Sequence, residues 1–196
     1  TAYNALAMYF DGTGDMLELA AHTDWNFEDA FTIEMWVYVS SIASYDGIVT
    51  FDGSAAGDLT VGFGTDSKIH LMSHAGNAKS VVNSGKTIST ATWHHIAVTR
   101  VGGTTRFFLN GELGSTSTEW TDSWGTTGST TAARIGRYYY ADDEKYFDGY
   151  MDNIRITKGY ARYTKDFSQQ LPILARTITN NRAGEFTVRG NALWVG

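Results

Sequence analysis

Hydrophobic and polar residues alternate with a period of two along much of this chain, a pattern typical of β-strands with one buried face. The clearest run covers residues 31–39, where apolar side chains occupy every second position from Phe31 to Val39. Glu34, Trp36 and Tyr38 share the opposite face. We expect the first face to be core. The second face carries aromatic rings, and it either forms the floor of a groove or lies beneath a loop.

Residues 93–111 predict a hairpin, because two β-rich runs flank Gly102-Gly103, a dipeptide suited to a two-residue turn. A second turn at Asn110-Gly111 would close the return strand. A hairpin this apolar must bury one side, so the rest of the chain has to supply a second sheet.

Other short runs separated by Gly, Asp and Asn predict more strands and no long helix. Strands are expected at residues 6–10, 16–19, 47–51, 59–63, 68–73, 133–136 and 149–157. Regular spacing of short strands favours an all-β fold, an antiparallel two-sheet β-sandwich, over alternating strands and helices. The expected core comprises Phe31, Ile33, Met35, Ile96, Val98, Phe107, Leu109, Ile154 and Ile156.

Composition fits this fold and narrows the function. The chain of 196 residues is long enough to bury a large core, and 21 Gly with 1 Pro and 14% aromatics suit many strands joined by tight turns. Without cysteine it has no disulfide and no thiolate chemistry. A net charge of −6 disfavours nucleic acid, and no apolar run is long enough to span a bilayer.

Several motifs together resemble a known family. Y-F-D-G-T-G-D, F-T-I-E-M-W-V, T-W-H-H-I-A-V-T-R and F-F-L-N-G are similar to the concanavalin A-like, laminin-G-like jelly rolls, over roughly residues 6–172. The stretch G-Y-M-D-N-I-R-I-T-K-G-Y-A-R-Y-T is most similar to copies in bacteriophage virion and tail-associated proteins. The resemblance implies a jelly roll over residues 1–172 that is non-catalytic and that binds glycans or proteins or builds larger assemblies.

Asp152 is the most informative carboxylate, because period two puts it on the face of Ile154 and Ile156, which we assign to the core. A buried carboxylate needs hydrogen bonds or a cation. One hypothesis is that backbone N–H groups or an arginine hold it. The other is a structural Ca²⁺ site, which related modules often have, with the ligands Asp11, Asp15, Asp148 and Asp152.

Neither zinc binding nor catalysis is predicted. His94 and His95 are adjacent on a strand and point to opposite faces, and His70 and His74 would lie about 13 Å apart on one strand. A glycosidase normally needs two placed carboxyl groups, and Glu34 stands alone among aromatic residues.

Aromatic residues in expected loops are the candidate ligand site. Rings beside carboxylates suit sugars, because a ring covers C–H surface while the acid accepts O–H bonds. The same residues would serve a protein–protein contact or fold back onto the sandwich. The candidate residues are Trp120, Trp124, Tyr138, Tyr139, Tyr140, Asp142 and Asp143, with Glu144 beside them.

Residues 173–196 lie beyond the resemblance and are too apolar for a solvated tail, so we expect a small hairpin or arm through which copies assemble. The sequence thus favours a module on the surface of a phage particle or similar assembly, in contact with other virion proteins or surface glycans. The alternative is a carbohydrate-binding module of a secreted, polysaccharide-active protein. Both place the protein on a virion surface or outside the cell.

Overall fold

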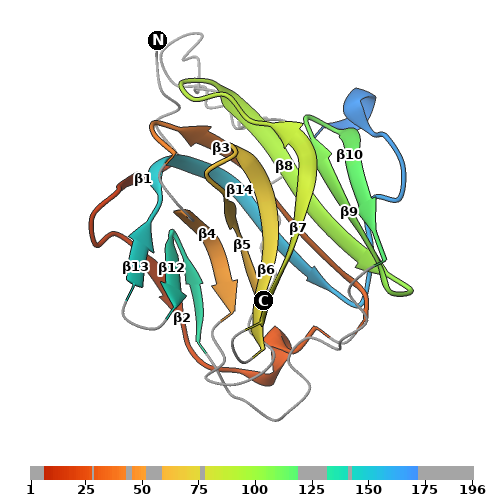
Figure 1. Ribbon diagram of the computed structural model, residues 1–196, viewed down its shortest axis with the longest axis horizontal. Coiled ribbons are helices and arrows are strands. Elements are labelled where there is room, and N and C mark those ends of the chain that lie inside the picture. The colour runs from red at the N-terminus through yellow and green to blue at the C-terminus, as the bar shows by residue number, and fades with distance from the viewer. Residues whose placement is uncertain are drawn as a thin grey trace, which may run out of the picture.

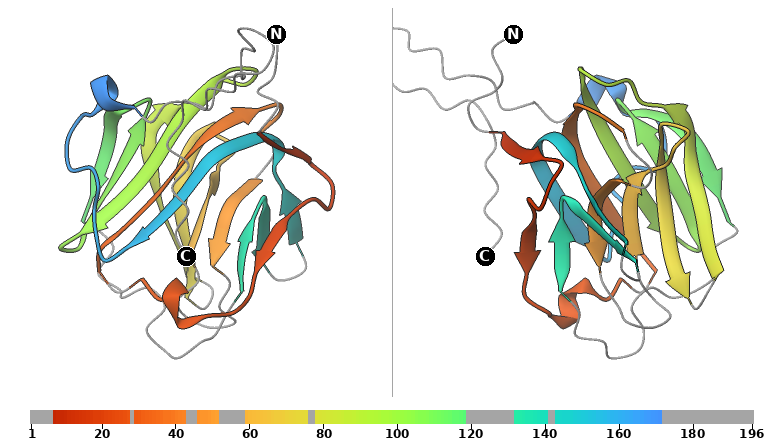
Figure 2. Two further views of the ribbon diagram at one scale, coloured as in Figure 1. Left: turned by 180° about the vertical axis from the view of Figure 1, so that it is seen from behind. Right: turned by 60° about the vertical axis from the view of Figure 1, so that its left-hand side comes forward.

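Two antiparallel six-stranded sheets pack face to face in the computed structural model of the chain (Figure 1). The structure describes residues 7–27, 29–42, 46–51, 59–75, 78–118, 132–140 and 143–171. Sheet A has the strand order β1-β14-β3-β8-β9-β10, and sheet B has the order β2-β11-β4-β5-β6-β7. The predicted all-β sandwich is confirmed, and its two layers are seen side by side in the turned views of Figure 2.

Both sheets draw strands from all along the sequence. In sheet A the strands are β1 (Met8–Asp11), β3 (Phe31–Val39), β8 (Trp93–Val101), β9 (Thr104–Leu109), β10 (Glu112–Ser117) and β14 (Asp148–Lys158). In sheet B they are β2 (Leu17–Leu19), β4 (Asp46–Phe51), β5 (Leu59–Phe63), β6 (Lys68–Ala75), β7 (Ala78–Thr87) and β11 (Ala133–Ile135). The remaining elements are a small hairpin, β12 (Arg137–Tyr140) with β13 (Asp143–Tyr146), and two short 3-10 helices, η1 (Thr23–Trp25) and η2 (Ser168–Gln170).

The core lies between the sheets and has the composition expected from the alternation. Phe31, Ile33 and Met35 of β3 are at most 1% exposed, as are Ile96 and Val98 of β8. Phe107 is also buried, while the other three expected core residues, Leu109, Ile154 and Ile156, are partly buried and pack against the core. Burial of these side chains supplies the main stabilisation of the sandwich.

The hairpin of β8 and β9 has the predicted register and turn. Gly102 and Gly103 have φ angles of 57° and 70°, which glycine adopts without strain. Their N–H groups donate to the two carboxylate oxygens of Asp29, at 2.8 and 3.0 Å. These two hydrogen bonds lower the pKa of Asp29 and fix the turn against the loop that precedes β3.

Some strands were not expected from the sequence. Strand β7 pairs with β6, and β10 forms the edge of sheet A beyond β9. Residues 137–146 form the β12–β13 hairpin, where a loop was expected. Strands β7 and β10 lie at sheet edges, where a strand needs few apolar side chains, so their polar sequences lack the alternation that predicts a strand.

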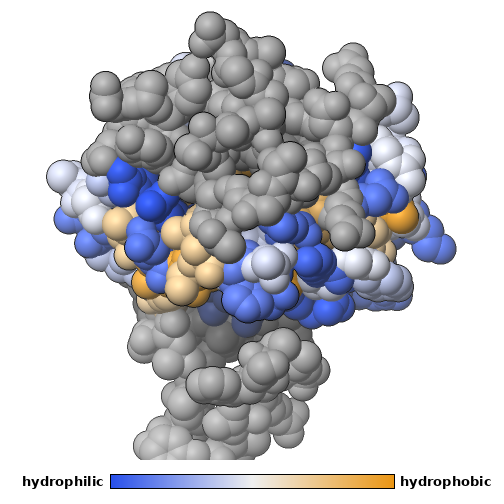
Figure 3. All heavy atoms as spheres, turned by 90° about the horizontal axis from the view of Figure 1, so that it is seen from below, coloured by the Kyte–Doolittle hydropathy of each residue, from blue (hydrophilic) through white to orange (hydrophobic). Residues whose placement is uncertain are grey.

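The surface of the sandwich is mixed in polarity. Figure 3 shows one face, on which described hydrophobic residues lie in small patches among hydrophilic ones. Among the described residues no helix is long and apolar enough to cross a membrane. The expected arm, residues 173–196, lies outside the described residues.

Candidate functional site: the outer face of sheet A

Four aromatic side chains lie in register on the outer face of sheet A, the face turned away from sheet B. Tyr9 of β1 pairs with Tyr150 of β14, Tyr150 pairs with Tyr38 of β3, and Tyr38 pairs with Trp93 of β8. Residues paired in this way point to the same side of a sheet, so the four rings form one row across four strands. We call these four residues the aromatic row.

The rings of the aromatic row touch one another and are accessible to solvent. Successive ring centroids are 4.9 Å apart for Tyr9 and Tyr150, 5.8 Å for Tyr150 and Tyr38, and 5.8 Å for Tyr38 and Trp93. Tyr9 is 55% exposed, and the other three are half-buried. A sugar ring placed on the row could therefore reach aromatic surface without any rearrangement of the core.

Carboxylates lie on the side of the row toward the start of β14. Asp11 and Asp148 are paired across β1 and β14, two residues from Tyr9 and Tyr150. Asp11 accepts a hydrogen bond from the Thr13 N–H at 2.7 Å, and Asp148 accepts one from the Ser41 hydroxyl at 2.7 Å. Asp15 accepts a bond from the Asp11 N–H at 3.1 Å, so three acids gather at this end of the sheet.

Asp152 lies on the other side of the row, and the prediction that it faces the core is wrong. It pairs with Trp36, while Arg155 pairs with Glu34, so β14 has one residue more than β3 in this interval. Such a bulge reverses the alternation of side chains. Asn153 takes a φ of 51° at this point, and its N–H donates to the Asp152 carboxylate at 2.7 Å. Asp152 is consequently half-buried on the outer face.

Farther along the same face, residues 160–171 run over the sheet and cover it. The Tyr163 carbonyl accepts from the Thr99 hydroxyl at 2.9 Å, and the Phe167 N–H donates to the Gly111 carbonyl at 2.7 Å. A Cβ on Gly111 would lie 2.5 Å from the Cα of Ser168, so glycine is needed there for the close approach as well as for its φ of 78°. We call residues 160–171 the covering segment.

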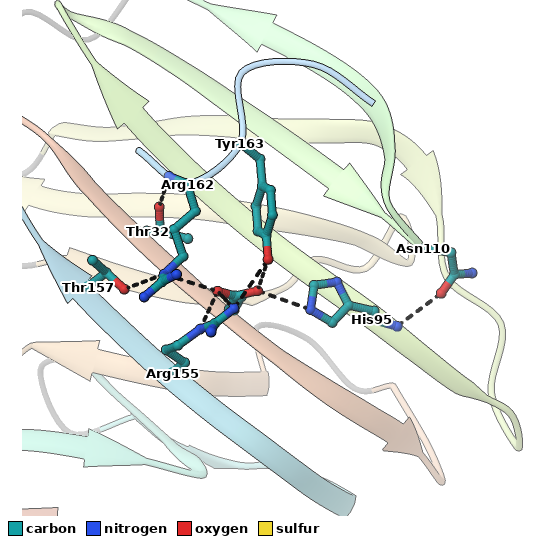
Figure 4. Close-up of polar contacts among 8 residues, drawn as sticks. Thr32, His95, Asn110, Arg155, Thr157, Arg162 and Tyr163 are labelled. Atoms are coloured by element: carbon teal, nitrogen blue, oxygen red, sulfur yellow. Dashed lines mark hydrogen bonds and ion pairs between the residues drawn. The ribbon is translucent and has the colours of Figure 1, made fainter. Parts of the chain in front are cut away.

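Beneath the covering segment, Glu34 is 1% exposed and surrounded by donors. Arg155 donates to its Oε1 at 2.6 Å, the Tyr163 hydroxyl donates to its Oε2 at 2.8 Å, and His95 Nε2 lies 3.3 Å from Oε2. Arg162 Nε is 3.7 Å from Oε1. Figure 4 shows the side chains of Arg155, Arg162, Tyr163 and His95 converging on one point of the sheet.

Two groups of this cluster, the Glu34 carboxyl and the Tyr163 hydroxyl, have shifted pKa values. Burial by itself raises the pKa of Glu34, but hydrogen bonds from His95 and Tyr163 and the charge of Arg155 outweigh it and hold the pKa below its ordinary value. Burial, together with the hydrogen bond to Glu34 and its negative charge, raises the pKa of Tyr163 to about 12. Glu34 is therefore ionised and Tyr163 neutral near pH 7.

Aromatic contacts complete the attachment of the covering segment. The rings of Tyr163 and Phe167 stack at 3.5 Å with an interplanar angle of 9°. Phe167 also contacts Phe108 at 5.3 Å and the edge of His95 at 5.7 Å. The Glu34 cluster thus anchors the covering segment, and because its carboxylate is shielded from solvent, it is not placed to act on a substrate.

The ligand site expected from the sequence lies only partly within the described residues, so it stays a prediction. Trp120, Trp124 and Asp142 lie outside the described residues. Tyr138, Tyr139 and Tyr140 belong to β12, and Asp143 begins β13, so these residues lie in a hairpin rather than a loop. Tyr138 is 6% exposed and does not present its ring to solvent.

The metal predictions concern the histidines of β8 and four aspartates. His94 and His95 point to opposite faces of β8, as predicted, with His94 paired to Val37 and His95 to Trp36. Among the described residues, no group of three or more His, Asp or Glu side chains could hold a metal ion. Asp11, Asp15, Asp148 and Asp152 are not found as such a group in the described part of the chain, and calcium binding at these residues stays a prediction.

The chain belongs to the concanavalin A-like lectin/glucanases superfamily, whose laminin-G-like family matches residues 11–162. No curated protein matches the sequence. Domain 4 of the Geobacillus stearothermophilus arabinanase AbnA, solved in complex with arabinotriose, is 17% identical, with a TM-score of 0.63 over 81% of this chain and 78% of that chain.

Two further solved structures have the same fold. A putative carbohydrate-binding protein from Bacteroides ovatus is 21% identical, with a TM-score of 0.58, and the match covers 83% of this chain and 46% of that chain. Domains LG4-5 of the mouse laminin α1 chain are 12% identical, with a TM-score of 0.53, over 83% of this chain and 48% of that chain. None of these three proteins comes from a bacteriophage, so they add no support to the resemblance to virion proteins.

Proposed function

We propose that the protein is a non-catalytic carbohydrate-binding module and that the aromatic row is its glycan platform. The observation that carries the proposal is the row itself, in which four rings on four adjacent strands are aligned and accessible. Aromatic faces cover the C–H surface of sugar rings, and the adjacent carboxylates of Asp11 and Asp148 accept bonds from sugar hydroxyls.

The comparisons favour this function over a structural role in a virus particle. The names of the arabinanase domain and of the Bacteroides ovatus protein refer to a bound oligosaccharide and to carbohydrate binding. At these identities the likeness establishes the fold alone, so the ligand must be argued from the site of this chain. The expected partners are surface or secreted polysaccharides outside the cell.

Affinity electrophoresis against a panel of soluble polysaccharides tests the proposal. We expect at least one polysaccharide to retard the protein, and Tyr38→Ala or Trp93→Ala to weaken that binding roughly tenfold, equivalent to 1.4 kcal/mol. Tyr160→Ala is the matched control, because Tyr160 is 62% exposed and lies in the covering segment, away from the row.

Single-site affinity for a glycan platform is low, so the panel should be repeated with the protein coupled to beads in many copies. The aromatic row would be refuted as a glycan site if no polysaccharide retarded the free protein or bound to the beads. Equal loss of binding in the Tyr160→Ala control would refute it as well.

A further inference from the structure

The aromatic row has carboxylates on both sides of it. Asp11 and Asp148 are two residues away along β1 and β14, and Asp152 is two residues away from Tyr150 in the other direction. Two residues of a strand span about 7 Å, so a ligand seated on the row has an acid within reach on either side. Asp15 adds a fourth carboxylate beside Asp11.

Two of these acids, Asp11 and Asp148, are not paired with a positive charge in the described part of the chain. Among the described residues, neither Asp11 nor Asp148 has a cationic partner; their contacts are the Thr13 N–H and the Ser41 hydroxyl. The nearest arginine on this face of β14 is Arg155, whose guanidinium is bound to Glu34 at 2.6 Å. The side of the row at Asp11 and Asp148 therefore carries negative charge that no described cation neutralises.

Resting on the proposed function, we infer that this site selects uncharged oligosaccharides and rejects glycans that carry uronic acid, sialic acid or sulfate. The hydroxyl groups of a neutral sugar can donate hydrogen bonds to the carboxylates. An anionic sugar instead places a like charge close to them, and its charged group can only accept hydrogen bonds, as the carboxylates do.

The titration of Tyr9 supports the sign of the field. Desolvation by its neighbours, followed by the negative charges of Asp148 and Asp11, raises the pKa of Tyr9 above its ordinary value. The negative charges of Asp11 and Asp148, beside the row, therefore affect the pKa of Tyr9, which belongs to the row.

The orientation of the ligand follows from the register. The row crosses the strands at right angles to their direction, and its ring centroids are 4.9–5.8 Å apart, about the length of one sugar unit. A linear glycan would lie across β1, β14, β3 and β8 and contact successive rings. Binding should strengthen with chain length up to about four sugar units.

A multivalent glycan array with matched neutral and acidic members tests the inference at low salt. Suitable pairs share one neutral core glycan and differ only by a terminal sialic acid or a sulfate group. We expect the neutral member of each bound pair to give about tenfold more signal, and the difference to shrink at high salt because charges are screened.

The double variant Asp11→Asn with Asp148→Asn tests the residues that set the selectivity. It should reduce the ratio of neutral to acidic signal about tenfold at low salt. Asp24→Asn with Glu112→Gln is the matched control, because it removes the same charge from side chains that are 72% and 63% exposed elsewhere on the surface. The control should leave the ratio unchanged.

The outcomes separate the two claims. Acidic members that bind as well as or better than neutral ones, in a way that Trp93→Ala abolishes, would overturn the selectivity and leave the glycan platform in place. Equal effects of the double variant and its control would also overturn it. An array without any signal that depends on Trp93 would overturn the proposed function itself.

Discussion

The outer face of sheet A is divided into two halves built on the same strands. In the covered half, the covering segment buries Glu34 and the rings around it, so that Glu34 is 1% exposed. In the open half, the aromatic row leaves Tyr9 55% exposed, although Tyr38 is only four residues from Glu34 on β3. The contrast shows that burial on this face is decided by residues 160–171 and not by the strands.

The two halves differ in what they could do. The covered half uses a charged residue for attachment, because a buried carboxylate is stable only when its oxygens are bound by donors. The open half presents rings and acids that can still accept a ligand. A substitution in the covered half should therefore change stability, and one in the open half should change binding.

The largest effect is expected from Glu34→Ala. This change leaves the buried His95 and the half-buried Tyr163 without their acceptor and detaches the covering segment. We expect the free energy of unfolding to fall by about 3 kcal/mol. This value is at the low end of what breaking a buried ion pair costs, because Arg155 and Arg162 are about one-third exposed. Urea denaturation measures it.

Glu18→Ala is the control for this change, because it breaks the ion pair to Arg134 with a carboxylate that is 51% exposed. It should cost less than about 1 kcal/mol. If the two variants lose equal stability, Glu34 is not the anchor of the covered half.

The division between the halves also marks what could be predicted from the sequence. Alternation in residues 31–39 and the Gly102-Gly103 turn predicted the sandwich, the core and the outward direction of Glu34, Trp36 and Tyr38, because period two is a local property. One alternative for that second face occurs at Glu34, which lies beneath residues 160–171, while Tyr38 lies in the open row. The other alternative, a groove, stays a prediction.

What could not be predicted depends on pairing between distant strands. The aromatic row needs the register of β1, β14, β3 and β8, and Tyr9 and Tyr38 are far apart in the sequence. The bulge at Asn153 places Asp152 on the outer face, and the local sequence pattern does not predict this bulge. The available signal was one aromatic residue at the outward position of each strand, which becomes informative only when the strand order is known.

A smaller effect is expected from Phe167→Leu. Leucine is apolar and somewhat smaller, and it loses the stacked contact with Tyr163 and the edge contact with His95. We expect a loss of about 1.5 kcal/mol, measured by urea denaturation. Glycan binding should be unaffected, because Phe167 belongs to the covered half; a parallel loss of binding would mean that the halves are coupled.

The pH dependence of stability should report the covered half. The pKa of Glu34 is below its ordinary value of 4.5 in the folded state, so its stabilisation is complete above that value and is lost as the pH falls through the folded pKa. The raised pKa of Tyr163 has the opposite sign: its contribution is complete below 10.0 and is lost as the pH rises toward about 12. The unfolding free energy of wild type should exceed that of Glu34→Gln most near pH 7, and this difference should shrink as the pH falls toward 3. Parallel curves from pH 3 to 7 would contradict this.

The smallest effect on stability is expected from Tyr9→Ala, which tests the open half at its most exposed ring. Tyr9 lies on the edge strand β1 and contacts Tyr150 on one side, so its removal creates no cavity in the core. We expect a change within about 0.5 kcal/mol in the free energy of unfolding, the same as for Tyr160→Ala. In affinity electrophoresis, however, Tyr9→Ala should weaken retention by a bound polysaccharide and Tyr160→Ala should not, because only Tyr9 extends the row. A large loss of stability in Tyr9→Ala would instead make the row a packing element of the sheet, and the distinction between the two halves would fail.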